Sequence, residues 1–252
     1  MALASVLRRL ALAALCLVGP GAAAAPAYQL DGTEVLELAS RSLPRDYQLF
    51  VSLPEGYAAS GERRYPLLLV MDANYAFPLV RSIARRVGDQ GRGLEDFILV
   101  GLSYAKGDTP QLSRGRDYTP SAGGSTKPDG GRRPDYGQSA AFRRFIADEV
   151  LPLIARSYRV DMARKTFAGH SYGALLGADI LLSERALFER YALSSPSLWF
   201  DQGLMFERER AYAARHQDLP AQLLLSVGEF EAAGAAATRR TWWPICAASS
   251  AC

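Results

Sequence analysis

The chain has 252 residues, of which 49% are hydrophobic and 22% are charged, and its formal net charge is +3. This composition is that of a globular protein, and the length suits one α/β domain with a sizeable core. Because acidic and basic residues nearly balance and no long basic run occurs, the sequence argues against nucleic acid as a partner.

The first 25 residues have the pattern of a secretory signal peptide. Arg8 and Arg9 give a positive start, an apolar run covers Leu10–Val18, and small residues at 22–25 offer cleavage sites. The apolar run is too short to span a bilayer comfortably, so we expect no stable membrane span after cleavage. We expect a periplasmic or secreted protein, and the alternative is an uncleaved apolar helix.

Cleavage would leave only two cysteines, Cys246 and Cys252. They form neither a metal-ligand spacing nor a disulfide framework, although a small loop closed by the pair is an alternative in an oxidising compartment. We therefore expect no metal and no other cofactor.

Apolar runs predict the strands of the N-terminal half. Val35–Leu38 and Tyr47–Leu53 are separated by a polar stretch, so they are expected to pair antiparallel. Leu67–Met71 and Phe97–Leu102 show no polar alternation, which is typical of parallel strands buried on both faces. A helix is expected between these two strands, over Phe77–Val87.

Residues 106–138 are rich in Gly, Pro, Ser, Asp and Arg and have no apolar period. A connection of this length is uncommon in a compact domain, so we expect a functional or mobile loop over a site. The alternative is a solvated surface insertion. Its arginines could meet an acidic or catecholate ligand; they are Arg114, Arg116, Arg132 and Arg133.

Helical spacing returns over Ala140–Tyr158, where Pro152 is expected to kink or split the helix. A second helix, made of small residues, is expected over Ala174–Leu182. Buried strands are expected over Arg164–Ala168, Tyr191–Ser194 and Leu223–Val227. The alternation predicts the α/β class, with a mostly parallel central sheet and helices on both faces.

Gly169-His170-Ser171-Tyr172-Gly173 fits the Gly-x-Ser-x-Gly pattern of a nucleophile elbow. The bare pattern occurs by chance, but here it lies between a predicted strand and a predicted helix. The two glycines allow a sharp turn without Cβ clashes. The turn would place the Ser171 hydroxyl at the positive end of the following helix, so we expect Ser171 to be a catalytic nucleophile.

An acyl-transfer site also needs N–H groups aimed at the oxygen on which negative charge develops. The backbone N–H of Tyr172, the residue after the nucleophile, is expected to be one donor. The loop after the strand at 67–71 is expected to give the second, at the N–H of Asn74. The alternative for that loop is a plain Asp-Asn turn.

The chain resembles the esterase branch of the α/β hydrolases, which holds enterobactin-type siderophore esterases, esterase D and the mycolyltransferases. Besides the elbow, the resembling stretches follow the family's order between residues 30 and 231. The siderophore esterases are most similar at Asp-Tyr-Thr-Pro and at Ser-Pro-Ser-Leu-Trp. The resemblance implies an α/β-hydrolase fold, hydrolysis of a small-molecule carboxylic ester through an acyl-enzyme, and substrate contacts from Arg116, Tyr118 and Trp199.

The same family places a triad acid just after the penultimate strand, which falls here on Glu229 or Glu231. Glu231, three residues after Gly228, is the better positional match. In the family the triad histidine follows the acid, and no histidine follows Glu231 here. His170 lies inside the elbow and His216 precedes the acid, so both match the position of the base poorly.

Residues 232–252 have no apolar period, and the final strand and helix of the fold are expected to be missing. Our hypothesis is that a frameshift near residue 232 replaced the natural C-terminus. The expected organisation is a signal peptide over 1–25, a hydrolase domain over 26–231 and an atypical tail over 232–252. Because the histidine is missing, a catalytically impaired or vestigial binding protein is one alternative to an active esterase, and an acyltransferase of the same fold is another.

Overall fold

The computed structural model describes residues 28–88, 93–123, 135–183 and 187–231. The chain divides into two units at Asp31, and the described part of the first unit contains no helix or strand. The predicted signal peptide, the tail after residue 231, and Arg132 and Arg133 lie outside the described residues. The fold below is that of the second unit, from Gly32 onward.

The described residues form one sheet in the order β1-β2-β4-β3-β5-β6-β7. β2 pairs antiparallel with β1 and with β4, and the remaining neighbours are parallel. This arrangement confirms the predicted α/β class and the mostly parallel sheet. The strands are β1 (Thr33–Ala39), β2 (Asp46–Ser52), β3 (Tyr65–Val70), β4 (Ile98–Leu102), β5 (Val160–His170), β6 (Arg190–Ser194) and β7 (Gln222–Ser226).

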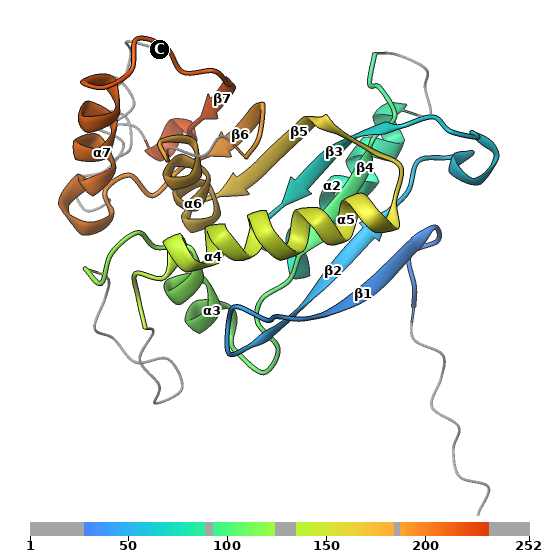
Figure 1. The fold of residues 1–252 in the computed structure, drawn as a ribbon, viewed down its shortest axis with the longest axis horizontal. Coiled ribbons are helices and arrows are strands. Elements are labelled where there is room, and N and C mark those ends of the chain that lie inside the picture. The colour runs from blue at the N-terminus through green and yellow to red at the C-terminus, as the bar shows by residue number, and fades with distance from the viewer. Residues whose placement is uncertain (1–27, 89–92, 124–134, 184–186, 232–252) are drawn as a thin grey trace, which may run out of the picture. The chain divides into compact units, whose positions relative to one another are not determined.

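Helices cover both faces of the sheet (Figure 1). One face packs against α2, where Ala73 and Phe77 contact Val70 and Leu99. A Cβ on Gly101 of β4 would lie 2.6 Å from the Cβ of Ala73, so glycine lets α2 approach the sheet closely. The other face packs against α4, α5 and α6. These helices are α2 (Ala73–Gly88), α4 (Ser139–Phe145), α5 (Leu151–Ser157) and α6 (Tyr172–Leu181).

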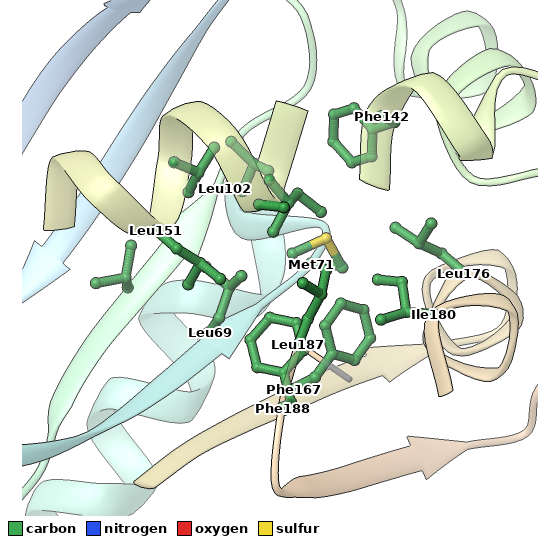
Figure 2. Close-up of a cluster of buried hydrophobic side chains, with 14 of the residues drawn as sticks. Leu69, Met71, Leu102, Phe142, Leu151, Phe167, Leu176, Ile180, Leu187 and Phe188 are labelled. Atoms are coloured by element: carbon green, nitrogen blue, oxygen red, sulfur yellow. The ribbon is translucent and has the colours of Figure 1, made fainter. Parts of the chain in front are cut away.

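The larger core joins the central strands to α6 and α4. Figure 2 shows Leu69, Met71 and Phe167 in one cluster, with Leu176 and Ile180 of α6 beside them. The rings of Phe167 and Phe188 meet edge to face, with centroids 5.4 Å apart. Each of these buried side chains stabilises the fold by about 1.5–3 kcal/mol relative to exposure. The core therefore fixes the strands that lead to the elbow.

Helix α2 differs from the prediction in its first residue, whereas the predicted interruption of the helix at 140–158 is confirmed. α2 begins at Ala73 rather than Phe77, because the Asp72 carbonyl accepts the N–H groups of Tyr75 and Ala76 and so starts the first turn earlier. The predicted helix at 140–158 is α4 and α5 joined by a π-helical segment, η2 (Ile146–Val150). Pro152 lies in the first turn of α5, and its missing N–H removes a bond to the preceding turn, which widens there.

The predicted loop at 106–138 contains a helix, α3 (Pro110–Asp117), so that prediction was wrong for these eight residues. Thr109 caps the helix by accepting the N–H of Leu112, and Pro110 suits its first position. Leu112 is its only large apolar side chain, which explains why no apolar period appeared. Instead, buried Asp117 anchors the helix. Its carboxylate accepts hydrogen bonds from Arg45, just before β2, and from the Tyr47 hydroxyl in β2.

Within the described residues β7 is an edge strand, and its Leu224 is 66% exposed. No helix in this part of the chain is long and apolar enough to cross a membrane. The remaining elements are η1 (Tyr57–Ala59), η3 (Phe200–Gly203), α7 (Leu204–Ala213) and η4 (Glu229–Glu231).

Candidate active site

The predicted strand, turn and helix are all present around Ser171. β5 ends at His170 and α6 begins at Tyr172, so Ser171 alone makes the turn, with φ 55° and ψ −116°. A non-glycine residue whose backbone is held in this sparsely populated φ/ψ region lowers the stability of the fold by of order 1–3 kcal/mol. A Cβ on Gly169 would lie 2.4 Å from the backbone of Gly173, so the strand and the helix touch here and require glycine.

Hydrogen bonds hold Ser171 to the end of β6. Its N–H donates to the Ser194 carbonyl at 3.0 Å, and its own carbonyl accepts the N–H of Ser197 at 3.2 Å. The hydroxyl oxygens of Ser171 and Ser197 lie 3.2 Å apart. Ser197 is completely buried and was not predicted from the sequence, although it lies in the Ser-Pro-Ser-Leu-Trp stretch.

The two predicted oxyanion donors both belong to first turns of helices. Tyr172 is the first residue of α6 and Asn74 the second residue of α2. N–H groups in first turns point out of the helix and favour negative charge. The Asn74 side chain accepts the N–H of Tyr104 at 3.0 Å, which ties this turn to the residues that follow β4. Their role as an oxyanion hole stays a prediction.

A buried carboxylate that the sequence did not indicate lies beside the elbow. Asp72, between β3 and α2, is 1% exposed and has a φ of 56°. Its Oδ1 pairs with Arg114 Nε at 2.8 Å, and its Oδ2 accepts the Tyr75 hydroxyl at 3.4 Å. Burial raises the pKa of the Asp72 carboxyl, and the Arg114 charge and the Tyr104 hydroxyl oppose this rise.

Arg114 is the predicted loop arginine that reaches the elbow. Its Nη2 donates to the His170 carbonyl at 3.4 Å, and its guanidinium carbon lies 5.6 Å from the centre of the Tyr172 ring. Arg116 is instead paired with Asp108 and Asp117. Of these two arginines, Arg114 therefore has the position expected of a residue in the site.

The two predicted aromatic substrate contacts both lie near the elbow but differ in accessibility. Tyr118 is 1% exposed, and its hydroxyl accepts the N–H of Asp72 at 3.3 Å, so it holds the backbone of Asp72 from inside the core. Trp199 is half-buried, with its ring 6.2 Å from that of Tyr172. Trp199 is thus the better placed of the two for contact with a substrate, which stays a prediction.

The two candidate acids lie in η4, after β7. The N–H of Ser195 donates to the Ser226 carbonyl at 2.7 Å, so β7 ends at the same edge of the sheet as the elbow. Glu229 is exposed. Glu231 folds back over Gly228, and its Oε2 is buried without a hydrogen bond to any described residue. A buried acceptor of this kind suits an acid whose partner is an N–H donor.

Neither histidine of the 252 residues takes the position of a base in the described structure. His170 is exposed and holds Arg114 through its backbone carbonyl. His216 stacks on Tyr212 and contacts the Tyr212 carbonyl, in a cleft beside Tyr191 at the far end of β6 from the elbow. The described residues contain no group of three or more His, Cys, Asp or Glu side chains that could hold a metal ion.

The chain is similar in sequence and in fold to known proteins. The ferri-bacillibactin esterase BesA of Bacillus subtilis (strain 168) is 30% identical over 212 residues, covering 81% of this chain and 73% of the relative. The siderophore enterobactin esterase of Emericella nidulans is 27% identical over 198 residues, covering 73% of this chain and 65% of the relative. The crystal structure of the BES protein from Bacillus cereus superposes with a TM-score of 0.70 at 26% identity, covering 82% of this chain and 80% of that one.

The sequence also matches a family model. The match covers residues 40–241, which includes the elbow and extends past the predicted domain boundary at residue 231. These matches and the mostly parallel sheet confirm the predicted α/β-hydrolase fold. The chain therefore belongs to the esterase family described as "Putative esterase".

Proposed function

We propose that this chain hydrolyses carboxylic esters, with Ser171 as the nucleophile that forms an acyl-enzyme. The observation that carries the proposal is the strained turn at Ser171, which places this residue before the first turn of α6. Strain of this kind persists at functional sites, where the surrounding structure holds it. For a serine without a functional role, the same backbone strain would lower the stability of the fold with no compensating benefit.

In the proposed reaction, Ser171 Oγ attacks the ester carbonyl carbon, and the alcohol leaves to give the acyl-enzyme. The N–H groups of Tyr172 and Asn74 bind the oxyanion of the tetrahedral intermediate. Water then releases the acid and restores the Ser171 hydroxyl. Both steps need a base for the attacking proton and an acid for the leaving oxygen, and Glu231 is our candidate for the carboxylate that orients this base.

The proposed substrates are siderophore-type esters. This proposal rests on the relatives, which are a ferri-bacillibactin esterase and an enterobactin esterase. It is supported by accessible side chains around the elbow. Tyr75, which contacts Asp72, is half exposed; Trp199, near Tyr172, is half-buried; and the Arg114 side chain is 23% exposed. Aromatic faces and a guanidinium can stack on the rings of a catecholate and bind its charge.

Turnover of p-nitrophenyl acetate and of a ferric catecholate trilactone tests the proposal, with Ser171→Ala as the comparison. The expected result is turnover by the wild type that the variant lacks. A fluorophosphonate probe should label the wild type once, on the peptide that contains Ser171. Equal turnover by the two proteins, or labelling at another residue, would contradict the nucleophile assignment.

We also propose that the chain is exported, with a signal peptide over 1–25, a hydrolase domain over 26–231 and an atypical tail over 232–252. The charged, apolar and small-residue order of the first 25 residues supports export to the periplasm or the medium. Expression of the full chain in a Gram-negative host, followed by fractionation and N-terminal sequencing, tests this. A mature start near Pro26 is expected, and an intact Met1 in the cytosolic fraction would contradict it.

A further inference from the structure

The Asp72–Arg114 ion pair lies between the two helix ends that carry the proposed oxyanion donors. Asp72 belongs to the turn that starts α2, two residues before Asn74. Arg114 belongs to α3 and contacts the elbow on both sides of Ser171, at the His170 carbonyl and at the Tyr172 ring. The pair thus connects three segments that are far apart in the sequence.

Asp72 is held from several directions. Its carbonyl accepts the N–H groups of Tyr75 and Ala76, its N–H donates to Tyr118, and its carboxylate binds Arg114. The left-handed φ of 56° is uncommon for a residue other than glycine, and these bonds help to hold it. The position of Asp72 therefore depends on its ion pair with Arg114 as well as on the hydrogen bonds of its own backbone.

The carboxylate of Asp72 also limits how closely α2 and α6 approach each other. A Cβ on Gly173 would lie 3.1 Å from Asp72 Oδ2, so this oxygen packs directly against the backbone of the elbow. Arg114 binds the other oxygen of the same carboxylate at 2.8 Å. The Asp72 side chain therefore contacts both the elbow and Arg114, which itself binds the elbow.

We propose that Asp72 and Arg114 form a positioning unit, which keeps the first turn of α2 in register with the elbow so that the N–H groups of Asn74 and Tyr172 point at one oxygen. The inference rests on the proposed function of Ser171. Two donors stabilise an oxyanion only if both lie within hydrogen-bond distance of the same atom, and loss of one donor lowers the rate by about 10²–10³-fold. A displacement near 1 Å has an effect of about 10²-fold.

The first test is hydrogen–deuterium exchange on Arg114→Gln, which does not depend on activity. Amides in both 73–77 and 170–175 should exchange faster, by about tenfold, because both segments lose a shared contact. Arg159→Gln is the matched control. Arg159 also lies over a tyrosine ring, that of Tyr57 at 3.9 Å, and binds the Arg63 carbonyl, but at the other end of β5. It should leave both segments unchanged.

The second test is a double-variant cycle in turnover of p-nitrophenyl acetate, a substrate that carries no catecholate for Arg114 to bind. Arg114→Gln and Asp72→Asn should each lower kcat by about 10²-fold with KM within about threefold, because the oxyanion forms only after binding. The double variant should lose no more than either single variant, since the two residues act as a unit. If Arg114→Gln does not fold, Arg114→Lys, which keeps the charge without the fork of donors, should show a smaller loss of the same kind.

Three outcomes would overturn the proposal. Unchanged exchange in either segment would show that the pair does not couple them. A rise in KM with unchanged kcat would make Arg114 a substrate contact instead. Multiplying losses in the double variant would show two independent roles. If the wild type turns over no faster than Ser171→Ala, the proposed function fails, and the exchange experiment alone then decides whether the pair couples the two turns.

Discussion

The hydroxyl oxygen of Ser197 lies 3.2 Å from the hydroxyl oxygen of Ser171, and the Ser197 N–H donates to the Ser171 carbonyl. Ser197 is completely buried, so its hydroxyl has little freedom to turn away. Two contacts from one residue hold both the backbone and the side chain of the proposed nucleophile. Ser197 therefore helps to set the rotamer of the Ser171 side chain.

Replacing Ser197 by Ala should lower the reactivity of Ser171 by about five- to tenfold, since a hydrogen bond between neutral groups contributes about 1 kcal/mol. The second-order rate of fluorophosphonate labelling measures this. Ser195→Ala is the control, because Ser195 is also buried but meets the neighbouring strand through its backbone N–H. Equal rates for wild type and Ser197→Ala would show that the contact does not affect the nucleophile.

Gly169→Ala should destabilise the fold by more than about 3 kcal/mol, because the new Cβ would lie 2.4 Å from the backbone of Gly173 and neither segment can move without breaking the turn. Urea unfolding followed by circular dichroism gives the free energy of unfolding. Gly228→Ala is the comparison, since its Cβ would meet nothing closer than 3.6 Å. A Gly169→Ala protein as stable as Gly228→Ala would show that the elbow is looser than the structure indicates.

Glu149 joins α4–α5 to the turn between β1 and β2, and this link should depend on pH. It is 6% exposed, and it accepts the N–H groups of Arg41 and Ser42 at 2.8 and 2.9 Å. Burial alone would raise the pKa of the Glu149 carboxyl, but these N–H groups and the hydroxyls of Ser40 and Ser42 lower it below its ordinary value. The ionised form is therefore more stable in the folded chain than in the unfolded chain.

Glu149→Gln should lower the free energy of unfolding by about 2 kcal/mol at pH 7, because the charged acceptor is lost. A depressed carboxyl pKa gives stability that is fully present above the ordinary pKa and is lost as the pH falls through the depressed one. The difference between wild type and variant should thus shrink below about pH 4. Glu37→Gln, at an exposed ion pair with Lys106, should show little effect at either pH. A difference that does not change with pH would contradict the role of the charge.

The elbow and the strands could be predicted because their signals are local. The strands of the parallel sheet are continuous apolar runs, and Ser171 lies between two glycines at a junction of strand and helix, which is enough to indicate the turn. The edge at which β3, β5, β6 and β7 end follows from their parallel pairing.

The remaining parts of the site depend on contacts between distant residues. Arg114 and Asp72 are 42 positions apart, and Ser171 and Ser197 are 26 apart. No pattern within a segment indicates such pairs. The helix α3 was missed for a similar reason, because its buried Asp117 is satisfied by Arg45, 72 positions earlier, rather than by an apolar face.

The buried oxygen of Glu231 leads to a prediction about the base. Neither histidine of the 252 residues lies between the proposed nucleophile and the candidate acid in the described structure, and a base contributes about 10²–10⁴-fold to such reactions. Added imidazole should therefore raise the rate of Ser171 labelling at least tenfold and approach saturation, because it can accept the Ser171 proton while donating its N–H to Glu231.

N-methylimidazole, which has no N–H, should raise the labelling rate less than imidazole does. Glu231→Gln should reduce the effect of imidazole more than Glu229→Gln does. Ser171→Ala gives the background at each concentration. Fast labelling without imidazole would show that the chain supplies its own base, and equal rescue by the two azoles would remove Glu231 from the site.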